Sequence, residues 1–324
     1  MKIFVADALD SHSKIELITG KVGLFQEPIT DNLFKEVKSL ESSEAILVPH
    51  DAYYFSKYPD YLEYLNCLAA SKIVIFSDRG DFPKKPKIIN SVALRVAISP
   101  GESPLHKIVI PYNVKSLAFL PFKKLEVKPT VSFVGFIPNI SIGRVKHALL
   151  QSPLHPIKGN GAIVRHLTDK NLRESDIIYK GVIRESYGAL DSNQVDMSKN
   201  RSEYLDAISQ TDFVACPRGD ANQSARFYET LSAGRIPLIP DTSIVFPNAL
   251  GKLNPNLFIR FPLSGSGMSD MISTYYSSIN SQSNYDRLQK ELRKSFSVNY
   301  QFEPFLRNIF KLSISQFLRL VSLV

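Results

Sequence analysis

Two charged residues three positions apart, Arg226 and Glu229, have the types and the spacing to bind a nucleotide. On a helix this spacing places both side chains on one face. A guanidinium binds a diphosphate through two parallel hydrogen bonds, and a carboxylate one turn further along can accept both ribose hydroxyls. Arg218, in the preceding loop, could supply a second guanidinium. The alternative is that Arg226 and Glu229 form an ordinary surface ion pair.

The elements that must position these residues lie in the segment Phe213–Asp241, which has the pattern of a strand, a loop, a helix and a second strand. An apolar run at 213–216 predicts a short buried parallel strand. Asp220 or Asn222 could cap the helix, and Gly234 stands where a left-handed residue ends one. In such units a ligand binds where the strand's carboxyl end meets the helix N-terminus, whose free N–H groups favour anions.

The string Cys-Pro-Arg-Gly-x4-Ser-x-Arg-x2-Glu-x-Leu-x2-Gly-x-Ile-Pro, from Cys216 to Pro237, resembles the signature of exostosin-like glycosyltransferases. The resemblance implies an α/β protein of the GT-B fold, with two Rossmann-like domains facing each other across a cleft. It also implies a nucleotide-sugar donor, a UDP sugar by family resemblance, held by the C-terminal domain. Transfer to a glycan or other hydroxyl acceptor would invert the anomeric carbon without a metal.

The same resemblance adds Gly219 and Ser224 to Arg218, Arg226 and Glu229 as donor-binding residues. Members of the family often carry Cys where this chain has Arg235, directly after the glycine that ends the helix. This departure affects the expectation for the acceptor side more than that for the nucleotide.

A second loop follows the apolar run Thr130–Phe136, which predicts a strand, and it leads into a helix that Ser141 could cap. The Phe-x-Gly at 133–135, with Arg144 downstream, again resembles the exostosin pattern, in which this loop faces the donor. Arg144 is therefore a further donor-binding candidate. The alternative is a solvated residue in the first turn of a helix.

The domain organisation follows from the spacing of apolar runs and from one proline- and lysine-rich segment. Five β-branched runs alternate with helical or loop segments, which predicts an open parallel sheet in a first, acceptor-side domain at 1–125. Residues 121–129 have the composition of a linker. The nucleotide-sugar-binding domain is expected at 126–300 and an amphipathic helix at 301–324.

The final stretch, residues 305–324, is strongly apolar, and its charged side chains are all basic. A basic amphipathic helix can lie on a membrane surface, which would make the protein peripheral at a membrane. Alternatively, as in GT-B proteins, the last helix crosses back to cover the first domain. Both alternatives stay open at this point, and they can coexist.

Inverting transfer needs a base that accepts the proton of the acceptor hydroxyl, and the first domain is expected to supply it. Candidates lie after the predicted strands, where loops open toward the other domain; the base candidates are His50, Asp51 and Asp81. Carboxylates in loops also cap helices, so the sequence does not rank these three.

Composition limits the partners. The 324 residues carry a net charge of +8, which favours an anionic partner. No basic ladder interleaved with aromatics and no zinc-finger spacing occurs, so nucleic acid is not expected. No Asp-x-Asp pair or His/Cys cluster suggests a metal, and no cofactor is expected. Cys67 and Cys216 are predicted to be buried reduced thiols.

The first apolar run, Lys2–Ala6, is too short for a signal peptide or a membrane span, so a cytoplasmic enzyme is expected, with membrane contact through residues 305–324 as a further expectation. The competing hypothesis from another class is a non-catalytic protein that binds a nucleotide sugar or a glycan. A dinucleotide-dependent oxidoreductase is disfavoured, because Asp7-Ala-Leu-Asp-Ser-His follows the first strand where G-x-G-x-x-G would be needed.

Overall fold

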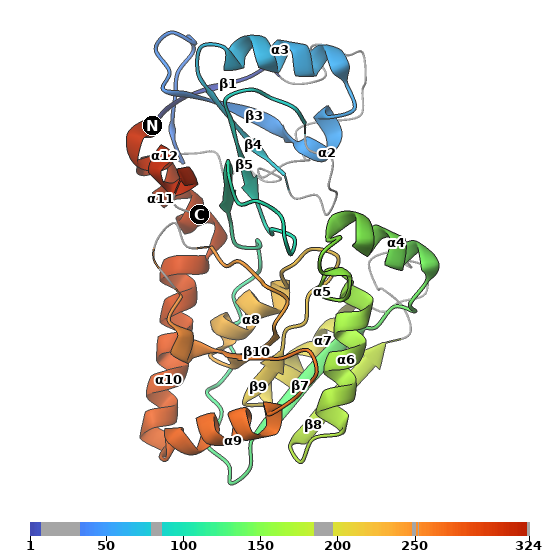
Figure 1. Cartoon of the computed structure of the whole chain (residues 1–324). Helices are drawn as coiled ribbons and strands as arrows, with labels where there is room; N and C mark the ends of the chain where they lie inside the picture. The colour runs from blue at the N-terminus through green and yellow to red at the C-terminus, as the bar shows by residue number, and fades with distance from the viewer. Residues whose placement is uncertain (8–32, 79–85, 185–196, 248–250, 252, 323–324) are drawn as a thin grey trace.

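A computed structural model describes residues 1–7, 33–78, 86–184, 197–247, 251 and 253–322 (Figure 1). Two parallel sheets, each flanked by helices, form two Rossmann-like α/β domains in one chain. The predicted fold class is confirmed, and the architecture is that of GT-B.

The first sheet has six strands in the order β2-β1-β3-β4-β5-β6, and every neighbouring pair is parallel. Five of its strands coincide with the predicted apolar runs. The sequence gives no signal for β2, because this two-residue strand is exposed and lacks an apolar pattern. The strands are β1 (Lys2–Val5), β2 (Lys35–Glu36), β3 (Ala45–Asp51), β4 (Ile73–Ser77), β5 (Ser91–Arg95) and β6 (Lys107–Val109).

Two helices, α2 (Ala52–Phe55) and α3 (Pro59–Ala69), cover this sheet. Phe55 and Tyr61 are fully buried against it. Cys67 on α3 is exposed, so the prediction that both cysteines are buried is wrong for this one. The reason is the period of the helix, which turns residues 61, 65 and 69 to the sheet and leaves 67 on the opposite side.

The second sheet has five strands in the order β11-β10-β9-β7-β8, again all parallel. They are β7 (Thr130–Phe136), β8 (Ile178–Arg184), β9 (Phe213–Ala215), β10 (Ile236–Pro240) and β11 (Ile259–Phe261). The helices of this domain are α4 (Ile142–Gln151), α5 (Pro156–Gly159), α6 (Gly161–Arg173), α7 (Met197–Ser209), α8 (Ala225–Ala233), α9 (Met268–Ile279) and α10 (Gln282–Ser295).

The end of the described chain forms two helices, α11 (Phe302–Lys311) and α12 (Ile314–Ser322), where the sequence suggested one. Their apolar faces are buried in the core of the first domain, into which Phe305, Ile309 and Phe317 pack (Figure 1). The amino-terminal ammonium of Met1 donates to the carbonyl of Phe310 over 2.7 Å. The apolar surface of these helices is therefore used within the chain. Across the described residues, no helix combines the length and the apolar character needed to span a bilayer.

The two domains meet through loops that follow β5 and β9. The side-chain amide of Asn222 donates to the carbonyl oxygens of Ile98 and Thr242, each over 3.1 Å. Ala221 is buried in the core of the first domain. Because both loops leave the carboxyl ends of their strands, those ends of the two sheets face each other.

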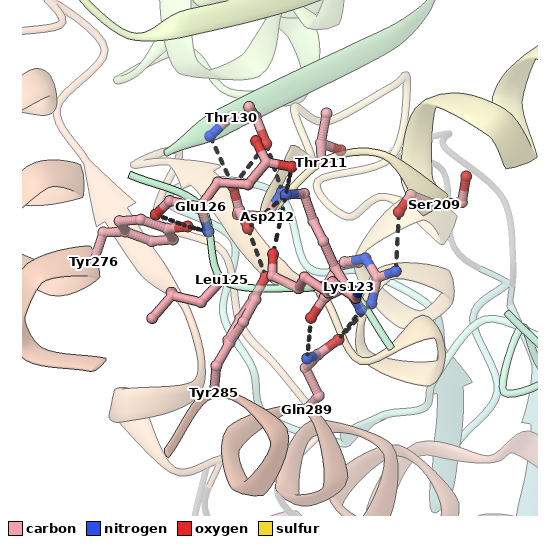
Figure 2. Close-up of polar contacts among 12 residues, drawn as sticks. Lys123, Leu125, Glu126, Thr130, Ser209, Thr211, Asp212, Tyr276, Tyr285 and Gln289 are labelled. Atoms are coloured by element: carbon pink, nitrogen blue, oxygen red, sulfur yellow. Dashed lines mark hydrogen bonds and ion pairs between the residues drawn. The ribbon is translucent and has the colours of Figure 1, made fainter. Parts of the chain in front are cut away.

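At the amino ends of β7 and β9, away from the first domain, a buried polar network surrounds Asp212 (Figure 2). Its carboxylate accepts hydrogen bonds from the backbone N–H of Thr130 (2.9 Å), from the hydroxyl of Thr130 (2.7 Å) and from that of Tyr285 (2.7 Å). Lys123 from the interdomain segment is the ion-pair partner, at 3.4 Å. Burial next to this carboxylate raises the pKa of Tyr285, so its phenol stays protonated as a donor. The network joins the linker, β7 and α10.

Arg235 lies at the same, amino end of the sheet. The side chain is fully buried, and its guanidinium donates to the carbonyls of Ile208 (3.1 Å), Ser209 (3.1 Å) and Pro121 (2.9 Å) and to the amide oxygen of Gln289 (2.8 Å). It precedes β10, at the amino end of the strand, and so lies away from the loops that face the first domain. The arginine at position 235 thus joins α7, the linker and α10.

Replacement of Arg235 by alanine should lower the stability of the protein by about 3 kcal/mol, because buried carbonyls at the ends of α7 and in the linker lose their donors. Urea-induced unfolding followed by tyrosine fluorescence measures the change. Arg287→Ala, on the exposed side of α10, is the matched control and should stay within about 0.5 kcal/mol of the wild type. Equal stability of the two variants would contradict the structural role.

Candidate functional site

The strand order identifies where a ligand would bind in the second domain. The chain passes from β7 to β8 on one side and returns to β9 on the other side of β7. In open α/β sheets, ligands bind at the carboxyl ends of the strands where the order reverses in this way. The loops after β7 and β9 border that point, and the second of them carries the predicted motif.

Arg226 lies in the first turn of α8 and extends toward the carboxyl end of β7. Its guanidinium stacks over the ring of Phe133, with 5.5 Å between the guanidinium carbon and the ring centroid. It also lies directly against Gly135, where any side chain would collide with the guanidinium. A β-carbon at position 135 would force the flexible guanidinium to shift, so glycine allows Arg226 its present position and gives the Phe-x-Gly pattern a physical reason.

Arg165 on α6 joins the two loops and was not among the predicted residues. It donates from Nε to the carbonyl of Arg218 (3.1 Å) and from Nη1 to the carbonyl of Phe136 (2.8 Å). The start of the same helix packs against the loop, because a side chain at Gly161 would collide with the carbonyl of Gly219. The sequence signal was a basic residue shortly after the Asn160 cap of an amphipathic helix, which by itself is common.

Arg184 is a second residue that sequence reasoning missed. It ends β8, and the parallel register places it beside Phe136 at the end of β7. Its Nη2 donates to the carbonyl of Asn200 over 2.5 Å. Burial lowers the pKa of Arg184, the charge of Glu203 opposes that shift and the charge of Arg226 adds to it. Arg226 lies against Gly135 and Arg184 lies beside Phe136, so both arginines are at the carboxyl end of β7, where their positive charge suits an anionic ligand.

Arg218 has a different environment. Its side chain is 2% exposed, and the guanidinium donates to the carbonyls of Lys158 (2.9 Å), Gly219 (3.2 Å) and Asp220 (2.5 Å). These contacts fix the shape of the loop after β9. Any contribution of Arg218 to anion binding would act through the charge and through the loop conformation that it holds.

The helix α8 begins one residue after Ser224, which occupies the capping position with an extended backbone. The prediction that Asp220 or Asn222 caps the helix is wrong, because the loop continues further and Asn222 is used to contact the first domain. Gly234 ends the helix with φ of 73°, the left-handed conformation that was predicted.

Arg144 is brought to the same loop from α4. The hydroxyl of Ser141 accepts the backbone N–H of Arg144 over 3.3 Å, which confirms the predicted cap. The guanidinium of Arg144 lies 3.6 Å from the carboxylate of Asp220, and both side chains are largely exposed. Arg144 is thus an accessible cation at the edge of the candidate site.

Glu229, one turn after Arg226, is held by the neighbouring helix α7. Its two carboxylate oxygens accept hydrogen bonds from Arg201 Nη1 (2.8 Å) and from the hydroxyl of Tyr204 (2.6 Å). Burial, and then the charge of Glu229, raises the pKa of Tyr204 well above its ordinary value, so that phenol is a donor at neutral pH. The surface-pair alternative would require an ion pair between Glu229 and Arg226. Within the described structure, the ion-pair partner of Glu229 is Arg201.

The base candidates lie at the carboxyl ends of the first sheet. Asp51 ends β3, is 3% exposed and accepts a hydrogen bond from the hydroxyl of Ser77 over 2.7 Å. His50 is equally buried, with its ring edge-on to that of Tyr61. Asp81 lies outside the described residues. The geometry ties Asp51 into the structure of the sheet edge, and its role as a base stays a prediction.

In the parts of the chain that the structure describes, no three His, Cys, Asp or Glu residues form a group that could hold a metal ion. Cys216, at the end of β9, is buried, and this burial raises the pKa of its thiol to about 12. The thiol is therefore neutral at physiological pH and is neither a nucleophile nor a ready metal ligand.

No family model matches the chain, and no curated protein matches it. The comparisons thus add no support for the exostosin family in particular. Solved structures do match over most of the chain. A glycosyltransferase from Rickettsia africae is 12% identical, with a TM-score of 0.38, over 81% of this chain and 68% of that one.

AviGT4, a glycosyltransferase of avilamycin A biosynthesis, is 11% identical with a TM-score of 0.37, over 100% and 98% of the two chains. The catalytic domain of starch synthase IV from Arabidopsis thaliana, solved with ADP and acarbose, is 9% identical with a TM-score of 0.43, over 86% and 73%. The chain is similar to these glycosyltransferases in its GT-B architecture alone.

Proposed function

We propose that this protein is a glycosyltransferase that moves a sugar from a nucleotide sugar to a hydroxyl acceptor, with inversion and without a metal ion. The observation that carries the proposal is the placement of Arg226 against Gly135 and of Arg184 beside Phe136, which brings two arginines to the carboxyl end of β7. Arg144 adds a third, accessible cation at its edge. A UDP sugar and a glycan acceptor are the substrates that the Cys216–Pro237 motif favours.

The chemistry requires the site to stabilise charge that develops on a leaving diphosphate. Fixed positive groups and backbone N–H donors do this best when they are oriented before the reaction. Arg226 is oriented in this way, because the ring of Phe133 and the bare backbone of Gly135 hold its guanidinium. The N–H groups in the first turn of α8, which follows Ser224, would add to this positive potential.

Glu229 would bind the ribose. Each of its oxygens accepts one hydrogen bond from α7, and a carboxylate offers about four acceptor positions in total, so capacity remains for ribose hydroxyls. Arg201 and Tyr204 would then act as positioning residues that orient this carboxylate.

A second candidate function is a protein that binds the nucleotide sugar without transferring it. The burial of His50 and Asp51 favours this alternative, because a base must reach the acceptor hydroxyl. Release of UDP from a UDP-sugar panel, with and without added glycan acceptors, separates the two functions: binding without any turnover across the panel would support the binder.

Replacement of Arg226 by alanine should lower the transfer rate by about 100-fold or more, because one oriented donor to the developing charge is lost. The thermal midpoint should change little, since the side chain is only partly buried. Arg226→Lys should recover part of the rate, because an ammonium cannot make the two-pronged contact.

The measurement pairs a thermal melt with a steady-state assay of UDP release, and Arg287→Ala serves as the control for loss of one arginine. Wild-type turnover in Arg226→Ala would show that this residue does not bind the diphosphate.

Glu229→Gln should weaken binding of UDP by about 1.5 to 3 kcal/mol, the range for hydrogen bonds to a charged group. Calorimetric titration with UDP measures the change, and titration with inorganic diphosphate is the matched control, because it lacks the ribose and should be affected far less. Unchanged affinity for UDP would exclude Glu229 from the nucleotide site.

Turnover should persist in excess EDTA, because arginines and the α8 N-terminus would take the part of a divalent ion at the leaving group. The assay of UDP release is repeated after dialysis against the chelator. Complete loss of turnover, restored by added Mn²⁺ or Mg²⁺, would refute the metal-independent mechanism.

A further inference from the structure

A run of exposed apolar side chains surrounds α4, on the part of the second domain that borders the candidate site. Ile142 is 89% exposed and Leu154 is 79% exposed, although both are large aliphatic residues. Soluble proteins seldom leave so many such residues in solvent within one short segment. The set, called here the α4 surface, is Ile140, Ile142, Val145, Leu149, Leu150, Leu154 and Ile157.

The helix is held so that this surface points away from the protein. Ala148 is its buried contact with the domain, and Ser141 caps its first turn. Ile142, Val145 and Leu149 follow the spacing i, i+3 and i+7, which places them on one exposed face. Figure 1 shows α4 projecting from the second domain at the level where the two domains meet.

The charge of the segment is entirely basic. Between Phe136 and Asp169 the sequence contains no aspartate or glutamate. Lys146 is four residues after Ile142 and shares its exposed face, and no ion pair of Lys146 is found in the described part of the chain. An amphipathic helix with lysine beside aliphatic residues is suited to the boundary between anionic head groups and acyl chains.

A second copy of the chain is a poorer occupant. In a two-fold dimer the same surface would face itself, so Lys146 and the neighbouring basic residues of both copies would approach one another. The surface also lacks the aromatic residues that are enriched at the centres of protein interfaces. An anionic lipid surface complements the positive charge and accepts the aliphatic side chains.

We propose that the α4 surface docks the protein on anionic membranes. This surface is distinct from α11 and α12, whose apolar faces are buried against the first sheet. Insertion of the aliphatic side chains supplies binding through burial of apolar area, and Lys146 adds attraction to the negative head groups. The proposal does not depend on the glycosyltransferase activity.

The test is co-flotation of the full chain with vesicles of phosphatidylcholine, with or without phosphatidylglycerol. Binding is expected with the anionic vesicles and should weaken as salt is raised. The double variant Ile142→Ser with Leu149→Ser should lower the partition coefficient about tenfold or more, because two aliphatic side chains no longer insert. Lys146→Glu should lower binding to anionic vesicles alone.

Val127→Ser is the matched control, since this valine is 97% exposed in the linker before the amino end of β7, whereas α4 follows the carboxyl end, and it should leave binding unchanged. Retained thermal midpoints would show that the variants fold, and the single Lys146→Glu variant tests the surface without removing apolar side chains.

Three results would each overturn the proposal. They are no flotation with anionic vesicles, equal flotation of the double variant and the wild type, or a wild-type dimer in solution that the double variant dissociates without any effect on vesicles. The last would identify the α4 surface as an interface between copies.

Discussion

Donation from buried and half-buried arginines to main-chain carbonyls is the interaction on which the second domain depends. Arg235 bonds to segments at the amino ends of the strands, and Arg165 and Arg218 bond to the loops at the carboxyl ends. A guanidinium can make five hydrogen bonds in a fixed plane, so one residue satisfies several carbonyls that would otherwise be buried without partners. Because these carbonyls belong to separate segments, each arginine joins parts of the chain that are distant in sequence.

Because these arginines have structural roles, other arginines at the carboxyl ends of the strands are the candidates for ligand binding. Arg218 and Arg165 shape the loops, whereas Arg226 and Arg184 reach neighbouring residues at the carboxyl end of β7. Repulsion between like charges is unfavourable for the unliganded protein, and an anion would relieve it. The candidate site lies at the switch point, where the loops after β7 and β9 leave opposite sides of the strand order.

The contact between the domains involves the loop that carries the motif. Asn222 in this loop donates to a carbonyl that follows β5, so the conformation of the loop is coupled to the first domain. The closing helices α11 and α12 also join the two halves of the chain, because they follow the last element of the second domain and pack on the first. An exposed α4 at the same level would then place the junction near a membrane surface.

The sequence alone determined the two-domain α/β class, most strand positions, the Ser141 cap and the left-handed Gly234, because apolar periodicity and local capping are properties of short segments. Local pattern also selected Arg226, Glu229 and Arg144. It could not reveal Arg165 and Arg184, since their positions result from strand register and helix packing, nor the burial of Arg218, His50 and Asp51. Only the tertiary structure decided these environments. The burial of a side chain and its distance from other charges depend on which segments pack together, and the spacing of residues in the sequence does not specify this.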